Sequence, residues 1–195
     1  MDEANLIESA RRGKVDAFNE LVLAYQDRVY NLAYRIMGDP ASASDAAQET
    51  FIAAYHSIDR FRGGSFKSYL LRIASNKCYD ELRRRKRRPA TFFEDLSEVD
   101  EEANPALING GEGPEEYVEQ REMARLIQAG IETLPPGQRV TLALSDVQGM
   151  SYQEIAEATD ISLGTVKSRL ARARAKLRDY LREQGELLPA RYRLG

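Results

Sequence analysis

One acidic stretch limits what this chain can fold into. Residues 89–120 hold ten acidic side chains and no basic one, together with three prolines and the pair Gly110 and Gly111. Proline and glycine interrupt helices, and acids without counter-charges repel one another. A flexible acidic linker over residues 89–113 is therefore predicted, because so long a loop is uncommon inside one compact domain. The alternative is an acidic surface loop of a single domain.

The acidic stretch also changes the meaning of the net charge. The whole chain has a formal charge of −3, which by itself argues against nucleic-acid binding. Residues 1–88 carry 16 basic and 12 acidic groups, and residues 121–195 carry 12 basic and 9 acidic groups. Two mildly basic parts therefore flank the acidic one, and each of them suits a polyanionic partner.

Composition excludes several classes of protein. Hydrophobic residues make up 43% of the chain, which is enough for a core. No run of 18 apolar residues and no signal-peptide core occurs, so neither membrane insertion nor export is expected, and the predicted location is cytoplasmic. A single cysteine, Cys78, argues against a disulfide framework and a cysteine-rich zinc site, and its place on an apolar stripe predicts a buried thiol.

An enzyme is the first alternative function to weigh. The only histidine, His56, and Cys78 fall on different predicted helices, and the sequence holds no glycine-rich phosphate loop and no metal-ligand cluster. We therefore expect neither catalysis nor a cofactor nor a bound metal.

Apolar residues recur at helical spacing along both flanking parts, whereas strand patterns are almost absent. Residues 15–37 carry one such stripe, which Gly38 ends. The sequence predicts an all-α protein with two small helical domains, residues 1–88 and residues 114–195, joined by the linker over residues 89–113.

The next helix is predicted to start at a cap formed by Ser42 or Ser44 and to run to about Ser57. One face of this helix is a core stripe. A second row contains Ile52 among polar and acidic residues, which suits either a partner surface or an ordinary solvated face. The residues of that row are Asp45, Gln48, Glu49, Ile52 and His56.

The last helix of the first domain is predicted to be capped by Ser65 and to end in six consecutive basic residues, 83–88. Basic side chains suit the negative end of a helix dipole and also suit DNA phosphates. A solvated end without a ligand is the alternative. The candidates for contact with the DNA backbone are Arg84, Arg85, Arg87 and Arg88.

A helix-turn-helix is predicted in the second domain. Helices over residues 114–133 and 137–147 come first, and Ser151 with Glu154 then forms a capping box for a short helix. A turn at Asp160 follows, and Ser162 caps a long basic helix. A capped helix, a tight turn and a second capped basic helix form the layout of many DNA-binding domains.

The long basic helix has two distinct sides. Its inward stripe is predicted to be Leu163, Val166, Leu170, Ala173 and Leu177. Its outer rows carry side chains that can donate to base edges and phosphates. A basic helix docked on a protein or a membrane is the alternative. The outer candidates for duplex contact are Thr165, Lys167, Ser168, Ala171, Arg172 and Arg174.

Two stretches resemble a known family. They are DAAQETFIAAYHSIDRFRGGSFKSYLLRIASNKCYDELRRRKRR and LPPGQRVTLALSDVQGMSYQEIAEATDISLGTVKSRLARARAKL, in this order and with a linker between them. The chain resembles the extracytoplasmic-function (ECF) sigma factors of the bacterial sigma-70 family. The resemblance implies binding to RNA polymerase core and promoter-specific initiation of transcription. In such proteins the second domain reads the minus-thirty-five element as duplex DNA.

The resemblance also implies roles for residues of the first domain. The loop over residues 57–65 would form one wall of a pocket for a flipped base of the minus-ten element. Tyr69 stands where the family usually has Trp, and core packing is the alternative role for Tyr69 and Phe61. The implied minus-ten residues are Phe61, Arg62, Lys67, Tyr69, Asn76, Lys77 and Asp80.

Protein partners follow from the same resemblance. The clamp helices of the largest polymerase subunit would contact Asp45, Gln48, Glu49, Ile52 and Tyr55. The flap of the other large subunit would contact helices near Leu142 and Leu144. An anti-sigma factor is a further expected partner, and the acidic linker would lie where RNA leaves the polymerase. A one-component regulator, which would bind its operator without core polymerase, is the second alternative function.

Overall fold

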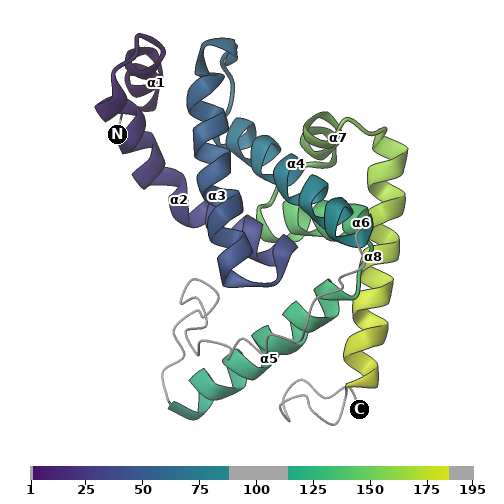
Figure 1. Ribbon diagram of the computed structural model, residues 1–195. Coiled ribbons are helices and arrows are strands. Elements are labelled where there is room, and N and C mark those ends of the chain that lie inside the picture. The colour runs from purple at the N-terminus through teal and green to yellow at the C-terminus, as the bar shows by residue number, and fades with distance from the viewer. Residues whose placement is uncertain (1, 88–113, 185–195) are drawn as a thin grey trace.

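The computed structural model describes residues 2–87 and 114–184, which are entirely helical apart from short turns (Figure 1). This confirms the prediction of an all-α protein. The predicted linker, Arg88 and the residues after position 184 lie outside the described residues. No helix in the described part is long and apolar enough to cross a membrane.

The N-terminal unit is a bundle of three long helices preceded by a short one. Its elements are α1 (Glu3–Arg11), α2 (Val15–Met37), α3 (Pro40–His56), the 3₁₀ turn η1 (Ile58–Arg60) and α4 (Phe66–Arg87). Helices α2, α3 and α4 pack against one another. The largest fully buried side chains of this core are Leu21, Leu32, Ile36, Phe66, Leu70 and Leu71.

The start of α3 differs from the prediction. The cap is Asp39, whose carboxylate accepts a hydrogen bond of 2.7 Å from the backbone N–H of Ser42. Pro40 explains the difference, because its fixed φ suits the first helical position and its missing N–H needs no partner there. The prediction of a cap at Ser42 or Ser44 was therefore wrong. Gly38, at φ 89°, ends α2 as predicted.

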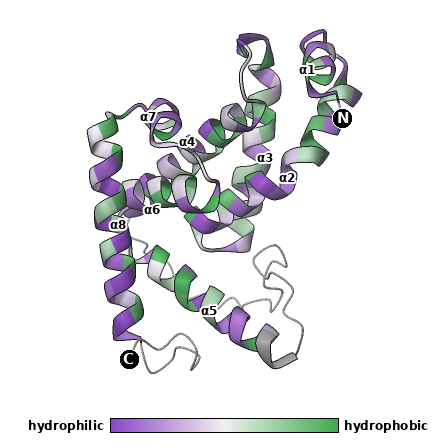
Figure 2. Ribbon diagram, turned by 180° about the vertical axis from the view of Figure 1, so that it is seen from behind, coloured by the Kyte–Doolittle hydropathy of each residue, from purple (hydrophilic) through white to green (hydrophobic). Residues whose placement is uncertain are grey.

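The C-terminal unit contains α5 (Pro114–Glu132), α6 (Pro136–Leu142), the π-helical turn η3 (Ala143–Val147), α7 (Tyr152–Thr159) and α8 (Leu163–Glu183). The single helix predicted over residues 137–147 is thus split into an α-helix and a π-helical turn, a feature that often marks functional sites. Hydrophilic residues are frequent along α8 (Figure 2).

The helix-turn-helix has the predicted local structure. Ser151 and Glu154 form a complete capping box at the start of α7. Asp160 adopts the left-handed conformation at φ 52°, and the Ser162 hydroxyl accepts from the backbone N–H of Thr165 at the start of α8. The turn and both caps are confirmed.

The two units pack against each other. Helix α4 contacts α6 and α7, and α2 contacts α5, α6 and η3 (Figure 1). The side of α4 predicted to bind nucleic acid is therefore partly in contact with the C-terminal unit.

Candidate nucleic-acid interface

The outer side of α8 presents most of the predicted duplex-contacting residues to solvent. Lys167, Ala171 and Arg172 are exposed, whereas Thr165 and Ser168 are half-buried. The inward stripe is confirmed for the buried residues Val166, Leu170 and Ala173. Leu163 differs, with 38% of its surface exposed, because it is the first residue of α8 and the buried side begins one turn later.

Arg174, the sixth predicted contact on α8, is held by other residues of the chain. Its guanidinium donates two hydrogen bonds to Asp146, at 3.0 and 2.6 Å, and further bonds to Ser145 and Tyr152. Hydrogen bonding from Arg174 lowers the pKa of Asp146 below its usual value. Arg174 thus fastens α8 to η3, and a DNA phosphate would have to compete with Asp146 for it.

Phe61 and Tyr69 both take part in an aromatic cluster around Phe66. The Phe61 ring is 8% exposed, and its centroid lies 5.6 Å from that of Phe66 and 5.2 Å from that of Tyr69. The Tyr69 hydroxyl shares a hydrogen bond of 2.6 Å with Ser57. The core role considered for these two aromatic residues is therefore present in the structure, and both residues also line a cavity.

That cavity has a volume of about 680 Å³ and lies between the two units. Residues 60–65, Tyr69 and Arg72 line it from the N-terminal unit. Met150, Glu154, Glu157 and Ala158 line it from the C-terminal unit.

Asn76 and Asp80 do not share the large cavity with Phe61. Asn76 is exposed and borders a small cavity of about 60 Å³ together with Tyr79, Thr159 and Arg169. Asp80 lies one turn further along α4 and lines a polar hollow between α3 and α4. The three residues predicted for one base pocket are thus spread over three hollows.

The polar hollow brings together residues for which the sequence predicts different partners. Lys77, a predicted DNA contact, forms an ion pair of 3.0 Å with Glu49, a predicted polymerase contact. Asp45 and Arg84 also line this hollow, whose volume is about 520 Å³. Sequence periodicity places each residue on its own helix face but does not reveal such a pair between helices.

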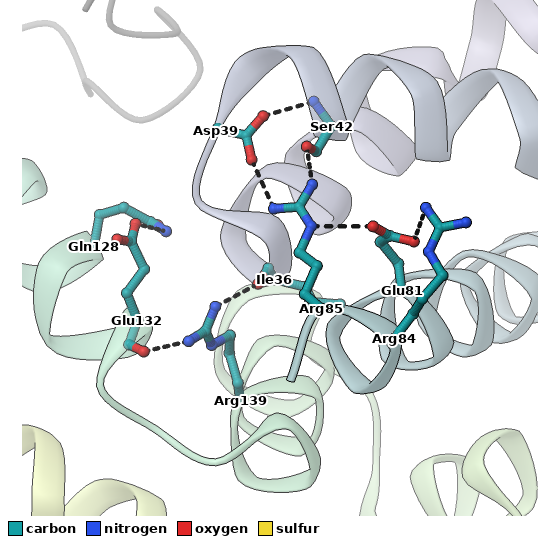
Figure 3. A network of polar contacts seen from close by, with 9 residues as sticks. All are labelled: Ile36, Asp39, Ser42, Glu81, Arg84, Arg85, Gln128, Glu132 and Arg139. Carbon is teal, nitrogen blue, oxygen red and sulfur yellow. Dashed lines mark hydrogen bonds and ion pairs between the residues drawn. The ribbon is translucent and has the colours of Figure 1, made fainter. Parts of the chain in front are cut away.

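The basic end of α4 is partly neutralised by acids (Figure 3). Arg85 donates to Glu81 at 3.0 Å and to Asp39 at 3.3 Å, and also to the Ser42 hydroxyl. Arg84 pairs with Glu81 at 2.6 Å. Burial would raise the pKa of Asp39, but hydrogen bonds from Ser42 and Arg85 outweigh it and lower that pKa. Arg85 therefore also fixes the start of α3, whereas Arg87 is exposed.

The predicted polymerase-contacting row of α3 is exposed at Asp45, Gln48, Glu49 and Ile52. Ile52 has 58% of its surface exposed, so a large aliphatic side chain meets solvent among these polar residues. Tyr55 differs from the other four, because it is half-buried and its ring packs at 5.0 Å against Phe18.

Two further predictions concern buried residues. Leu142 and Leu144 belong to the core, so their side chains cannot meet a partner, although the neighbouring Val147 is 40% exposed. Cys78 is fully buried, and burial raises the pKa of its thiol to about 12, which confirms the predicted buried thiol. Among the described residues, no group of three or more His, Cys, Asp or Glu side chains could hold a metal ion.

Two family patterns match the chain. Sigma-70 region 2 matches residues 21–88, and Sigma-70 region 4 matches residues 124–177. These two ranges lie on either side of the acidic stretch.

Curated relatives cover most of the chain. It is 35% identical over 181 residues to the ECF RNA polymerase sigma factor SigW of Bacillus subtilis, which covers 91% of this chain and 95% of that protein. It is 36% identical to the ECF RNA polymerase sigma-E factor of Escherichia coli K12, over 87% of this chain and 88% of that protein. It is 41% identical over 167 residues to SigE of Mycolicibacterium smegmatis, covering 85% of this chain but spanning only 62% of that relative's length.

Solved structures share the fold. The structure of CnrH in complex with the cytosolic domain of CnrY is 28% identical, with a TM-score of 0.61, over 90% of this chain and 94% of that chain. The sigma factor RpoE of Bartonella quintana, solved with the anti-sigma factor NepR, is 24% identical with a TM-score of 0.65, over 84% and 96% of the two chains.

Proposed function

Because the chain belongs to the ECF sigma factors of the sigma-70 family, we propose that it binds core RNA polymerase and directs it to specific promoters. The proposed division of the chain is a core-binding and minus-ten domain (1–88), an acidic linker (89–113) and a minus-thirty-five domain (114–195). Such a protein recruits a catalyst and is not itself an enzyme.

The observation that carries the proposal is the exposed outer row of α8 in a capped helix-turn-helix. An α-helix fits the major groove of B-DNA, where an arginine can donate two hydrogen bonds to guanine. Arg172 and Lys167 have the exposure and charge for that role, and Ala171 leaves room for close approach. These residues, with Thr165 and Ser168, would read the minus-thirty-five element.

The minus-ten element would meet the N-terminal unit. A melted strand needs an aromatic or apolar pocket for an unstacked base and cations for its phosphates. Phe61, Tyr69 and Arg62 line the large cavity beside residues 60–65, and Lys67 lies in the first turn of α4. Asn76, Lys77 and Asp80 lie further along α4 beside two other hollows and would contact the strand there, and Arg87 at the end of α4 would contact the DNA backbone.

Core polymerase would bind the exposed row of α3. This row combines an exposed aliphatic side chain, Ile52, with acidic and polar ones, a composition that fits a protein-binding surface. Polymerase flap contacts would come from the surface of η3 near Val147, since Leu142 and Leu144 are buried. An anti-sigma factor is proposed as a further protein partner, and the similar CnrH, 28% identical, was solved in complex with another protein, the cytosolic domain of CnrY.

Transcription with purified components tests the proposal. The chain and a core polymerase that lacks any other sigma factor should together produce transcripts from a cognate promoter. A one-component regulator would instead bind its operator without core polymerase and would need a separate sigma factor for transcription. Absence of transcripts from promoters that the chain binds as free protein would favour that alternative.

A further inference from the structure

Helix α1 contacts the loop that is proposed to wall a pocket for an unstacked base. This loop, called the pocket loop, spans residues 57–65, and α1 touches its 3₁₀ turn η1 (Figure 1). The helix buries Ile7 and Ala10, and the loop buries Ile58. Helix α1 lies outside the surfaces proposed for DNA and polymerase, yet it packs on the element that would shape the base pocket.

The second half of the pocket loop has little packing of its own. Residues 62–65 are all exposed. Gly63 and Gly64 have positive φ, 92° and 86°, and apart from its chain neighbours a Cβ atom at either position would meet no atom within 4 Å. The loop therefore takes its position from contacts made by its first half, where Ile58 and Phe61 are buried.

Aromatic rings of α4 supply these contacts. Phe66 is fully buried, and its ring centroid lies 5.6 Å from that of Phe61 and 5.7 Å from that of Tyr69. The Tyr69 hydroxyl shares a hydrogen bond with the Ser57 hydroxyl at the start of the loop. The first half of the loop is thus fixed at Ser57 and Phe61, and Phe66 is the ring that both attachments share.

The same cluster continues to α1 through Tyr25 on α2. The Tyr25 ring meets Phe66 edge-on, with centroids 5.7 Å apart, and its hydroxyl donates a hydrogen bond to the carboxylate of Glu3 in the first turn of α1. Burial and this hydrogen bond raise the pKa of Tyr25 to about 12, so the hydroxyl keeps its proton at neutral pH and remains a donor. A hydrogen bond to a carboxylate is stronger than one between neutral groups.

We propose that Glu3 and Tyr25 are positioning residues, which hold α1 and the aromatic cluster so that the pocket loop is ready to receive an unstacked base. Neither residue would touch DNA. A loop that is ordered in advance spares the ligand the cost of ordering it, and the apparent affinity falls with the fraction of chains in which the loop is competent. The proposal rests on the sigma-factor function for the identity of the ligand, but not for the effect on the loop.

A tryptophan reporter tests the effect on the loop without DNA. The chain contains no tryptophan, so Tyr69→Trp gives the aromatic cluster a fluorescence signal of its own while keeping an aromatic ring there. Adding Tyr25→Phe removes only the hydroxyl that binds Glu3. We expect the emission maximum to shift to longer wavelength and acrylamide to quench it more strongly. Unchanged emission and quenching would overturn the proposal.

Single-stranded DNA tests the consequence for base capture in the otherwise unchanged chain. The probe is the non-template minus-ten strand of a promoter that the chain transcribes with core polymerase, and its partner is the same strand without the base whose removal weakens binding most. Tyr25→Phe should weaken binding of the intact strand by about three- to tenfold, as the loss of one hydrogen bond predicts, and should reduce the preference over the abasic strand by a similar factor. A merely structural role would lower the amount of active protein for both strands and leave the preference unchanged, which would contradict positioning.

The matched control is Tyr34→Phe, the same change on the same helix. The Tyr34 ring stacks on Tyr30, with centroids 6.3 Å apart, and takes no part in the aromatic cluster of α4. It should leave quenching and base preference unaltered, and equal effects of the two substitutions would overturn the proposal.

Glu3 provides a second test, because the amide oxygen of glutamine can still accept from Tyr25. Glu3→Gln should therefore retain more of the base preference than Glu3→Ala, and equal losses would contradict a role for this hydrogen bond. Failure of the sigma-factor proposal looks different. It would be a lack of transcription with core polymerase, while tryptophan quenching still reports whether the pair orders the loop.

Discussion

At the scale of single residues, neighbouring arginines on α8 differ in what lies beside them. Arg172 points outward and is exposed, whereas Arg174 donates to Asp146, Ser145 and Tyr152. The sequence places both on outer rows of one basic helix. Asp146 lies 28 positions away from Arg174, so only the packing of η3 against α8 brings the two together.

Arg172→Ala and Arg174→Ala should therefore have different consequences. Loss of Arg172 should weaken binding to a duplex with the preferred minus-thirty-five element by about 1–3 kcal/mol and relax its specificity. Loss of Arg174 should lower thermal stability, by no more than about 1 kcal/mol because the ion pair is half-exposed. Binding titrations on matched and scrambled duplexes, with melting curves, separate the two. Base readout by Arg172 is contradicted if its loss weakens every duplex equally.

The same ion pair should make stability depend on pH. Hydrogen bonding from Arg174 holds the pKa of Asp146 below its unfolded value of about 3.9. The stabilisation is therefore complete above about pH 4 and disappears as the pH falls through the lower, folded-state pKa. Asp146→Asn should melt below the unchanged chain at pH 7, and the difference in melting temperature should vanish under strongly acidic conditions. A difference that stays constant down to pH 3 would assign the effect to something other than this carboxylate.

At the scale of elements, the turn between α7 and α8 depends on one strained residue. Asp160 at φ 52° is the sole non-glycine residue with positive φ in the described part of the chain. A left-handed conformation disfavours side chains by about 1–2 kcal/mol, less for aspartate and most for β-branched residues.

Asp160→Gly should consequently keep or raise the free energy of unfolding, whereas Asp160→Val should lower it by about 1–2 kcal/mol. Urea unfolding followed by circular dichroism measures both. Asp160→Asn serves as the control, since asparagine tolerates this conformation as well as aspartate does. Equal destabilisation by glycine and valine would show that the aspartate side chain itself, and not its backbone, matters at the turn.

Structural features that depend on residues close together in the sequence could be predicted. Features that depend on contacts between residues far apart in the sequence could not. The caps at Ser151 and Ser162 depend on residues within one turn, so their chemistry is visible in the sequence. The cap of α3 was misassigned because Asp39 precedes Pro40, and serines further on offered an equally common signal.

The candidate site shows the same difference between features set by nearby residues and features set by distant ones. The exposed rows of α3 and α8 follow from helical periodicity and were predicted. The pairs Lys77 with Glu49 and Arg85 with Asp39 join residues far apart in the chain, and no local pattern reveals them. The π-helical turn η3 was likewise missed, because one inserted residue in a helix leaves the apolar pattern of residues 137–147 nearly unchanged.

At the scale of the whole molecule, the contact between the two units is the feature with the widest effect. A compact chain of 195 residues has a radius of gyration of about 16 Å. Small-angle scattering of the free chain should approach this value from above, because the contacts of α4 with α6 and α7 hold the two units together. A radius of gyration far above it would contradict a lasting contact between the units.

Because α4 and α7 belong to one chain, their association has a fixed effective concentration. Making more copies of the protein leaves the fraction of chains with this contact unchanged. Only a ligand that binds better to chains without the contact shifts the balance, and it does so by no more than that preference. The share of chains in which the two helices touch is therefore a property of the sequence, independent of how strongly its gene is expressed.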